Sequence, residues 1–137
     1  MMRFSLCNEV LAGMPLERQC EMAARIGYQG LEIAPFTLSD TPEQITTREA
    51  ARIRAIVESF GLVVTGLHWL LVKPAGLSLT DPDSSLRAHT LDVMSRFTGL
   101  CAELGGKVLV HGSPKQRQIA IGETLNVAVD RLQDALS

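Results

Sequence analysis

The sequence predicts an α/β protein in which each of four strands is followed by a helix. Four short apolar stretches alternate with four amphipathic segments along the chain. Strands that are apolar on both faces are typical of a parallel sheet covered by helices. Three helix-to-strand joints carry a glycine, which supplies the left-handed residue that a tight reversal needs. The strands are expected near residues 3–7, 30–34, 62–68 and 107–111.

The first two units are defined by their turn residues. A turn at Gly13 and Pro15 closes the first strand, and the helix that follows stops at Gly27. Pro35 ends the second strand, and Thr47 is the expected N-cap of the second helix. These helices are expected over residues 16–26 and 48–60.

The last two units follow the same pattern. Gly61 separates the second helix from the third strand, and a long loop over residues 70–82 leads into the longest helix. Gly105 and Gly106 stop that helix, and a turn at residues 112–114 follows the fourth strand. The helices are expected from Ser84 or Ser85 to Leu104, and from Leu125 to Leu136.

Composition indicates one soluble domain over residues 1–137, because 46% of the residues are apolar and only 20% are charged. With 13 basic and 15 acidic residues, the chain has no electrostatic footprint for nucleic acid or an anionic membrane. No apolar stretch approaches the about 18 to 20 residues of a membrane span, and the start has no signal-peptide core. Three cysteines at no metal-binding spacing indicate reduced thiols, so we expect a cytoplasmic protein.

Two histidines stand at strand ends. The βα pattern fits either a flavodoxin-like sheet or half of a (β/α)8 barrel, and no phosphate-binding glycine fingerprint of the doubly wound folds follows a strand. His68 ends the third strand and His111 the fourth, and in a barrel such ends meet at one mouth. Two neutral imidazoles there suit a divalent metal ion. The alternative is that each ring satisfies a backbone carbonyl near the top of the core.

Four segments carry a family resemblance, among them Gly-Tyr-Gln-Gly-Leu-Glu-Ile and His-Gly-Ser-Pro-Lys-Gln-Arg. The segments are residues 4–9, 27–36, 65–71 and 106–117. Together they resemble the xylose-isomerase-like TIM-barrel superfamily, with the greatest similarity to its sugar phosphate isomerases and epimerases, which are related to the apurinic endonuclease IV branch. The resemblance covers essentially the whole chain. It implies a (β/α) barrel of TIM type, of which residues 1–137 are the first four βα units, a half-barrel.

The resemblance also implies a divalent metal ion (Mn, Mg, Zn or Co) at the barrel mouth. In the complete barrel a glutamate on strand five and Asp, His and Glu residues of later strands usually hold it. In the endonuclease branch, histidines ending strands three and four bind zinc, and His68 and His111 match those places. Because the chain stops before strand five, we expect no useful turnover from residues 1–137 alone, and which ion they would bind is left open. A fragment, a truncated gene and paired halves are the alternatives.

Glu32 is the candidate catalytic carboxylate, because a carboxylate inside an apolar strand is costly unless it is paired. It would accept a hydrogen bond from a substrate hydroxyl or belong to the metal shell; alternatively it forms a structural ion pair with a basic residue such as Arg3. Other strand-end residues are candidates for substrate binding, by loop contacts, by stacking on sugar C–H groups, or by holding a phosphate. These are Asn8, Glu9, Trp69, Lys115 and Arg117.

Three functions remain. The first is a metal-dependent isomerase or epimerase of a small-molecule sugar or sugar phosphate. The second is a zinc-dependent apurinic endonuclease, which the few basic residues at the mouth disfavour because DNA binding needs phosphate contacts. The third is a noncatalytic half-barrel. A half-barrel exposes two sheet edges, so we expect a homo-oligomer or a missing carboxyl-terminal half, and no membrane partner.

Overall fold

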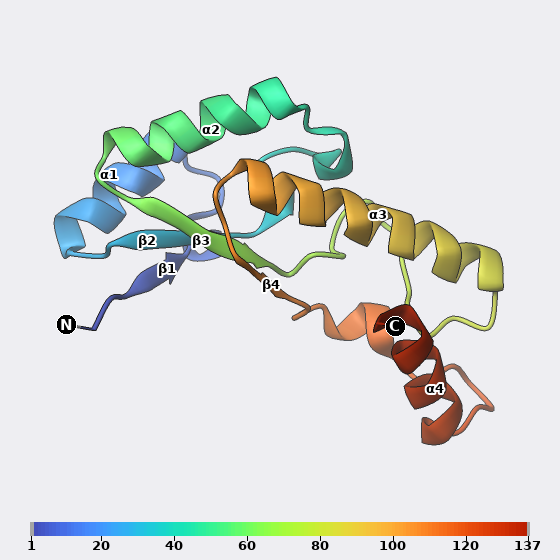
Figure 1. The fold of residues 1–137 in the computed structure, drawn as a ribbon. Coiled ribbons are helices and arrows are strands. Elements are labelled where there is room, and N and C mark those ends of the chain that lie inside the picture. The colour runs from blue at the N-terminus through green and yellow to red at the C-terminus, as the bar shows by residue number, and fades with distance from the viewer. Residues whose placement is uncertain (1, 137) are drawn as a thin grey trace.

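The computed structural model describes residues 2–136, which contain one parallel four-stranded sheet (Figure 1). The strands are β1 (Ser5–Cys7), β2 (Gly30–Ile33), β3 (Val63–His68) and β4 (Val108–Val110). They lie in the order β1-β2-β3-β4, and every neighbouring pair is parallel. This order confirms the barrel-type reading and excludes the flavodoxin-like sheet, in which the first strand lies between the second and third.

Helices cover one face of this sheet (Figure 1). The helices are α1 (Leu16–Ile26), α2 (Thr47–Ser59), α3 (Ser84–Glu103) and α4 (Leu125–Leu136), each within one residue of its expected bounds. The first three lie above the strands, whereas α4 lies apart, beyond the end of β4 (Figure 1). No helix of the described residues is both long and apolar enough to cross a membrane.

Thr46 caps α2, so the expectation of Thr47 was wrong by one residue. Thr46 Oγ1 accepts a hydrogen bond from the Glu49 backbone N–H at 3.3 Å, and a Glu49 carboxylate oxygen accepts one from the Thr46 N–H at 2.8 Å. This reciprocal capping box needs an acidic or amide side chain three residues after the cap. Only a cap at Thr46 places Glu49 at that position.

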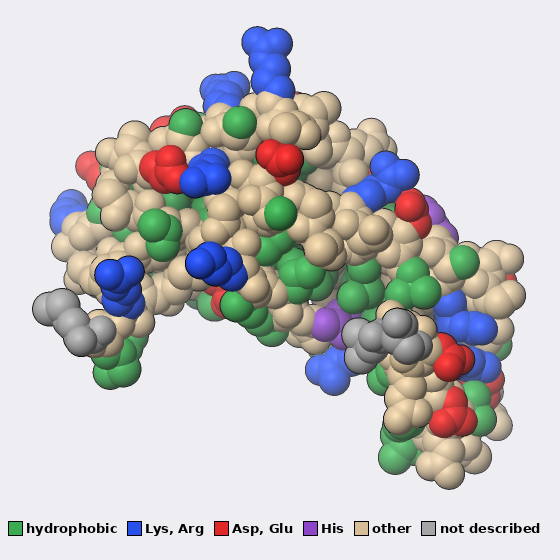
Figure 2. All heavy atoms as spheres, viewed as in Figure 1, with side chains coloured by type: hydrophobic (Ala, Val, Ile, Leu, Met, Phe, Trp, Pro, Cys, Tyr) green, Lys and Arg blue, Asp and Glu red, His purple; other side chains and the backbone are tan. Residues whose placement is uncertain are grey.

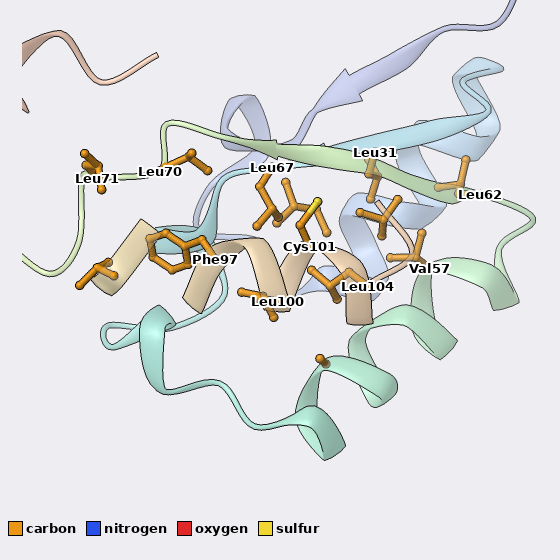
Figure 3. Close-up of a cluster of buried hydrophobic side chains, with 14 of the residues drawn as sticks. Leu31, Val57, Leu62, Leu67, Leu70, Leu71, Phe97, Leu100, Cys101 and Leu104 are labelled. Atoms are coloured by element: carbon orange, nitrogen blue, oxygen red, sulfur yellow. The ribbon is translucent and has the colours of Figure 1, made fainter. Parts of the chain in front are cut away.

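The core lies between the sheet and the helices. Figure 3 shows Leu31 and Leu67 on the strands beside Val57 from α2, Phe97 from α3 and Leu104 directly after α3. All five are essentially excluded from solvent. Burial of such large side chains is the dominant favourable contribution to folding, at roughly 1.5–3 kcal/mol for each. The buried core therefore lies on the helix-covered side of the sheet.

The opposite side of the sheet exposes apolar side chains. Val63 is 54% exposed although its neighbour Val64 is buried, as the alternation of a strand requires. Val108 and Val110 on β4 are also exposed, and Figure 2 shows hydrophobic side chains along the lower border of the molecule, beneath the strands. The strands β1 and β4 form the edges of the described sheet. This surface is what the first half of a barrel presents, and the expected oligomer or second half stays a prediction.

Gly66 on β3 lies too close to β4 for any side chain, because a Cβ there would lie 2.2 Å from the Val108 carbonyl oxygen. We expect Gly66→Ala to lower the free energy of unfolding by about 2 to 3 kcal/mol, as overpacking against backbone does. Gly99→Ala is the matched control, since a Cβ on that exposed turn of α3 meets nothing within 4 Å. It should add about 0.5 to 1 kcal/mol through helix propensity. Urea denaturation measures both; equal effects would contradict this packing.

Candidate functional site

Three side chains converge at the carboxyl ends of β1, β2 and β3. Cys7 closes β1, Glu32 is the penultimate residue of β2, and His68 closes β3. Cys7 lies opposite Glu32 in the sheet register. Among residues 2–136 they form the one group of three His, Cys, Asp or Glu residues whose ligand atoms all lie within 4.8 Å of one another.

An irregularity in the β2–β3 pairing determines which way His68 faces. Leu31 is opposite Val64, but Glu32 is opposite Gly66, so Thr65 is an extra residue on β3. Val64 and Leu67 are both in the core although they are three residues apart, which strict alternation forbids. The extra residue reverses the alternation. His68 therefore faces the same side of the sheet as Thr65 and Glu32, away from the core that Leu67 fills.

The two ring nitrogens of His68 have different surroundings. Its side chain is 5% exposed, and Nε2 lies 2.5 Å from a Glu9 carboxylate oxygen. Because an ionised carboxylate only accepts hydrogen bonds, this contact assigns the N–H to Nε2. Nδ1 is buried without a hydrogen-bond partner, 3.8 Å from a Glu32 carboxylate oxygen. Nδ1 thus faces Glu32 without a hydrogen bond.

Cys7 donates its thiol proton to Glu32 Oε2 at 3.0 Å. Burial raises the pKa of the Cys7 thiol to about 12, and the hydrogen bond and negative charge of Glu32 add to the effect. In the described chain Glu32 contacts Cys7 and His68 and forms no ion pair with Arg3, so His68 is the basic residue beside it and the choice between a catalytic and a structural role stays open. The Glu32 carboxylate therefore lies between the Cys7 thiol and the His68 imidazole.

The Asn8 side chain forms hydrogen bonds that hold in place the turn carrying Glu9. It is fully buried in the short helical turn η1 (Asn8–Leu11), and its amide nitrogen donates to Gln19 Oε1 at 3.0 Å and Thr37 Oγ1 at 2.7 Å. Its amide oxygen accepts from the Ala34 backbone N–H at 2.8 Å. The predicted substrate contact of Asn8 stays a prediction; the described geometry gives it a positioning role for Glu9.

Trp69 forms an apolar surface directly after His68. It has a φ of 53°, is 44% exposed, and lies 6.4 Å from the Phe36 ring, centroid to centroid. A bulky residue rarely adopts this left-handed conformation. The few residues that do so cluster at functional sites. A Cβ at Gly112 would lie 3.1 Å from the Trp69 ring, so that glycine leaves room for it. The geometry is compatible with the predicted stacking on a sugar.

His111 lies outside the group of three. Burial lowers its pKa, as does the positive charge of Arg117, and both ring nitrogens are buried without a hydrogen-bond partner. The Arg117 charge also opposes a cation at this ring. A metal ion shared by His68 and His111 therefore stays a prediction. Lys115 and Arg117 are exposed on the short helix η4 (Pro114–Arg117), where a phosphate role is likewise untested.

A groove lies elsewhere on the described surface. It has a volume of about 670 Å³ and is lined by the beginning of α1, the loop after β2 and the first turns of α2, with Met14, Thr37 and Arg52 among its residues. Neither Cys7 nor His68 reaches it. The strand-end cluster therefore remains the candidate site.

With this geometry established, comparisons with known proteins define the family. A model of the xylose isomerase-like TIM barrel family matches residues 20–137. The chain belongs to this family. Among curated proteins, no significant match was found.

Solved structures share the fold of this family member at low sequence identity. A D-psicose 3-epimerase structure determined in the presence of D-fructose matches with a TM-score of 0.72 and 15% identity, covering 98% of this chain and 46% of that one. The 3-keto-D-glucoside 4-epimerase YcjR from E. coli matches with a TM-score of 0.70 and 18% identity, covering 99% and 49%. D-Psicose 3-epimerase from Clostridium cellulolyticum with D-tagatose gives 0.71 and 14%, covering 98% and 47%. The chain thus spans about half the length of these proteins.

The raised thiol pKa predicts slow alkylation of Cys7 by iodoacetamide near pH 8, since the thiolate is the reactive form. Glu32→Gln removes the negative charge that raises the pKa, although its amide oxygen can still accept the thiol hydrogen bond, and burial, the largest cause, remains. We expect Cys7 to react severalfold faster in this variant, with Cys20 and Cys101 unchanged as internal controls. Peptide mass spectrometry over time measures the three rates. A Cys7 rate that does not change would contradict the assigned contact.

Proposed function

We propose that this chain is the sugar-binding amino-terminal half of a metal-dependent sugar isomerase or epimerase. Membership of the xylose isomerase-like family supports the proposal, as do structural neighbours named as epimerases. The observation that carries it is the carboxylate–imidazole–carboxylate arrangement of Glu9, His68 and Glu32 at the strand ends, beside an exposed Trp69. An enzyme that moves a proton next to a sugar carbonyl needs acid–base groups, and the apolar surface beside them can hold the sugar.

Sugar recognition falls to Trp69 and Glu9. The Trp69 ring, supported by Phe36, offers an apolar face to sugar C–H groups. Glu9 uses one carboxylate oxygen for His68 and is 29% exposed, so its second oxygen is free to accept from a sugar hydroxyl. For a sugar phosphate, the exposed cations Lys115 and Arg117 supply the counter-charge.

Proton transfer next to the carbonyl requires a positioned base. Glu9 is the more exposed of the two carboxylates, and one of its oxygens lies 2.5 Å from His68 Nε2. Glu32 takes the second of its two predicted roles, within a metal shell, because it faces the unused nitrogen of His68. A divalent ion at the mouth supplies polarisation of the carbonyl oxygen when bound.

An apurinic endonuclease remains the second candidate, favoured by the position of His111 and its two unpartnered ring nitrogens. The exposed cations near the mouth are few, which disfavours a duplex substrate. Both candidates place their substrate at the same strand ends, so one binding experiment distinguishes them.

Saturation-transfer NMR with D-fructose, D-tagatose and an abasic DNA duplex tests the proposed function. We expect the ketoses to bind and the duplex not to bind at physiological salt. Trp69→Ala should weaken ketose binding severalfold, because it removes the stacking surface. Glu9→Gln should also weaken ketose binding, because it alters the proposed acceptor of the sugar hydroxyl. Glu17→Gln, at an exposed carboxylate on α1, is its matched control and should leave binding unchanged. Ketose binding that is unaffected by Trp69→Ala, or binding of the duplex alone, would overturn the assignment.

A further inference from the structure

We propose that Cys7, Glu32 and His68 form a zinc site that this chain holds by itself. The ligands are the thiolate of Cys7, one carboxylate oxygen of Glu32 and Nδ1 of His68, which lie within 4.8 Å of one another. All three come from the ends of adjacent parallel strands, so backbone hydrogen bonding holds their spacing. The inference holds whether or not the assembled protein acts on sugars.

The unpartnered nitrogen of His68 is the observation that points to a ligand. A buried polar atom without a hydrogen bond costs free energy, and native proteins rarely leave one unless something occupies the position. His68 is 4% exposed, and its Nδ1 faces Glu32 at 3.8 Å, beyond hydrogen-bond length. An ion between the two would satisfy both groups.

Glu9 completes the arrangement as a positioning residue. Metal-binding histidines commonly donate their other N–H to a carboxylate, which orients the ring and raises the basicity of the ligating nitrogen. The Glu9 contact to Nε2, at 2.5 Å, has this form. Because the Asn8 side chain anchors the same turn through three hydrogen bonds, the ring orientation exists before any ion arrives.

The ligand chemistry selects the ion. A thiolate with an imidazole favours zinc over magnesium or manganese, which prefer oxygen ligands. Binding exchanges the Cys7 thiol proton for the ion, and that proton leaves to solvent. Three protein ligands leave one tetrahedral position open, as in zinc sites that accept water or substrate. The Glu32 carboxylate and the Cys7 thiolate also offset the charge of the ion, which Arg117 would oppose at His111.

Metal titration of the purified chain tests the site directly. Cobalt(II) serves as the spectroscopic probe for zinc, since a cobalt–thiolate bond gives a charge-transfer band in the near ultraviolet. We expect one cobalt ion for each chain, with that band, and its displacement by zinc. Cys7→Ser should abolish the band and weaken zinc binding by more than the roughly 10- to 100-fold that loss of an orienting residue costs. Cys20→Ala, at a thiol outside the group, should leave both unchanged.

Two further variants separate this site from its alternatives. Glu9→Gln should keep the band while weakening zinc binding roughly 10- to 100-fold, the usual effect of losing an orienting carboxylate. A band that persists in Cys7→Ser, or the absence of stoichiometric binding, would overturn the proposal. So would loss of binding in His111→Asn with binding retained in Cys7→Ser, which would assign the ion to the two histidines. Ketose binding by the metal-free chain reports on the proposed function separately.

Discussion

The extra residue in β3 is the constraint on which the site depends. With strict pairing from Val64 onward, Leu67 would face the open side and His68 would enter the apolar core. Thr65 is the extra residue that has no partner on β2. Leu67 therefore packs against the helices, and His68 faces Glu32. One residue of register therefore satisfies the hydrophobic core and places an imidazole at the strand ends.

Packing and chemistry are linked through the turns that follow the strands. Asn8 uses its whole amide to join the turn after β1 to the end of β2, and the adjacent Glu9 reaches across to His68. Trp69 follows His68 in a left-handed conformation and lies beside Phe36 from the turn after β2. Thus the first three βα units by themselves assemble a polar cluster with an apolar wall, on the side of the sheet that no described helix covers.

Local patterns predicted the helices, the strands and their parallel order, because helical periodicity and glycine caps are readable over short stretches. The cap of α2 was missed by one residue, since Thr46 and Thr47 differ only in where Glu49 falls. The role of Cys7 was missed because its partner Glu32 is 25 residues away, and Glu9 lies 59 residues from His68. Their strand-end positions were the available signal. Gly66 beside the bulge was the available sequence signal, since a glycine within a strand favours a bulge, but the register also depends on which core residues pack.

The direction of the His68 ring is the central claim, and NMR of its two ring nitrogens measures it directly. In metal-free protein at about pH 8, where an ordinary imidazole is neutral, long-range proton–nitrogen correlation should place the N–H on Nε2 and leave Nδ1 unprotonated. Added zinc should then shift the Nδ1 resonance and leave the Nε2 proton in place. A proton on Nδ1 in the metal-free protein, or a zinc-induced shift at Nε2 instead, would contradict this account of the site.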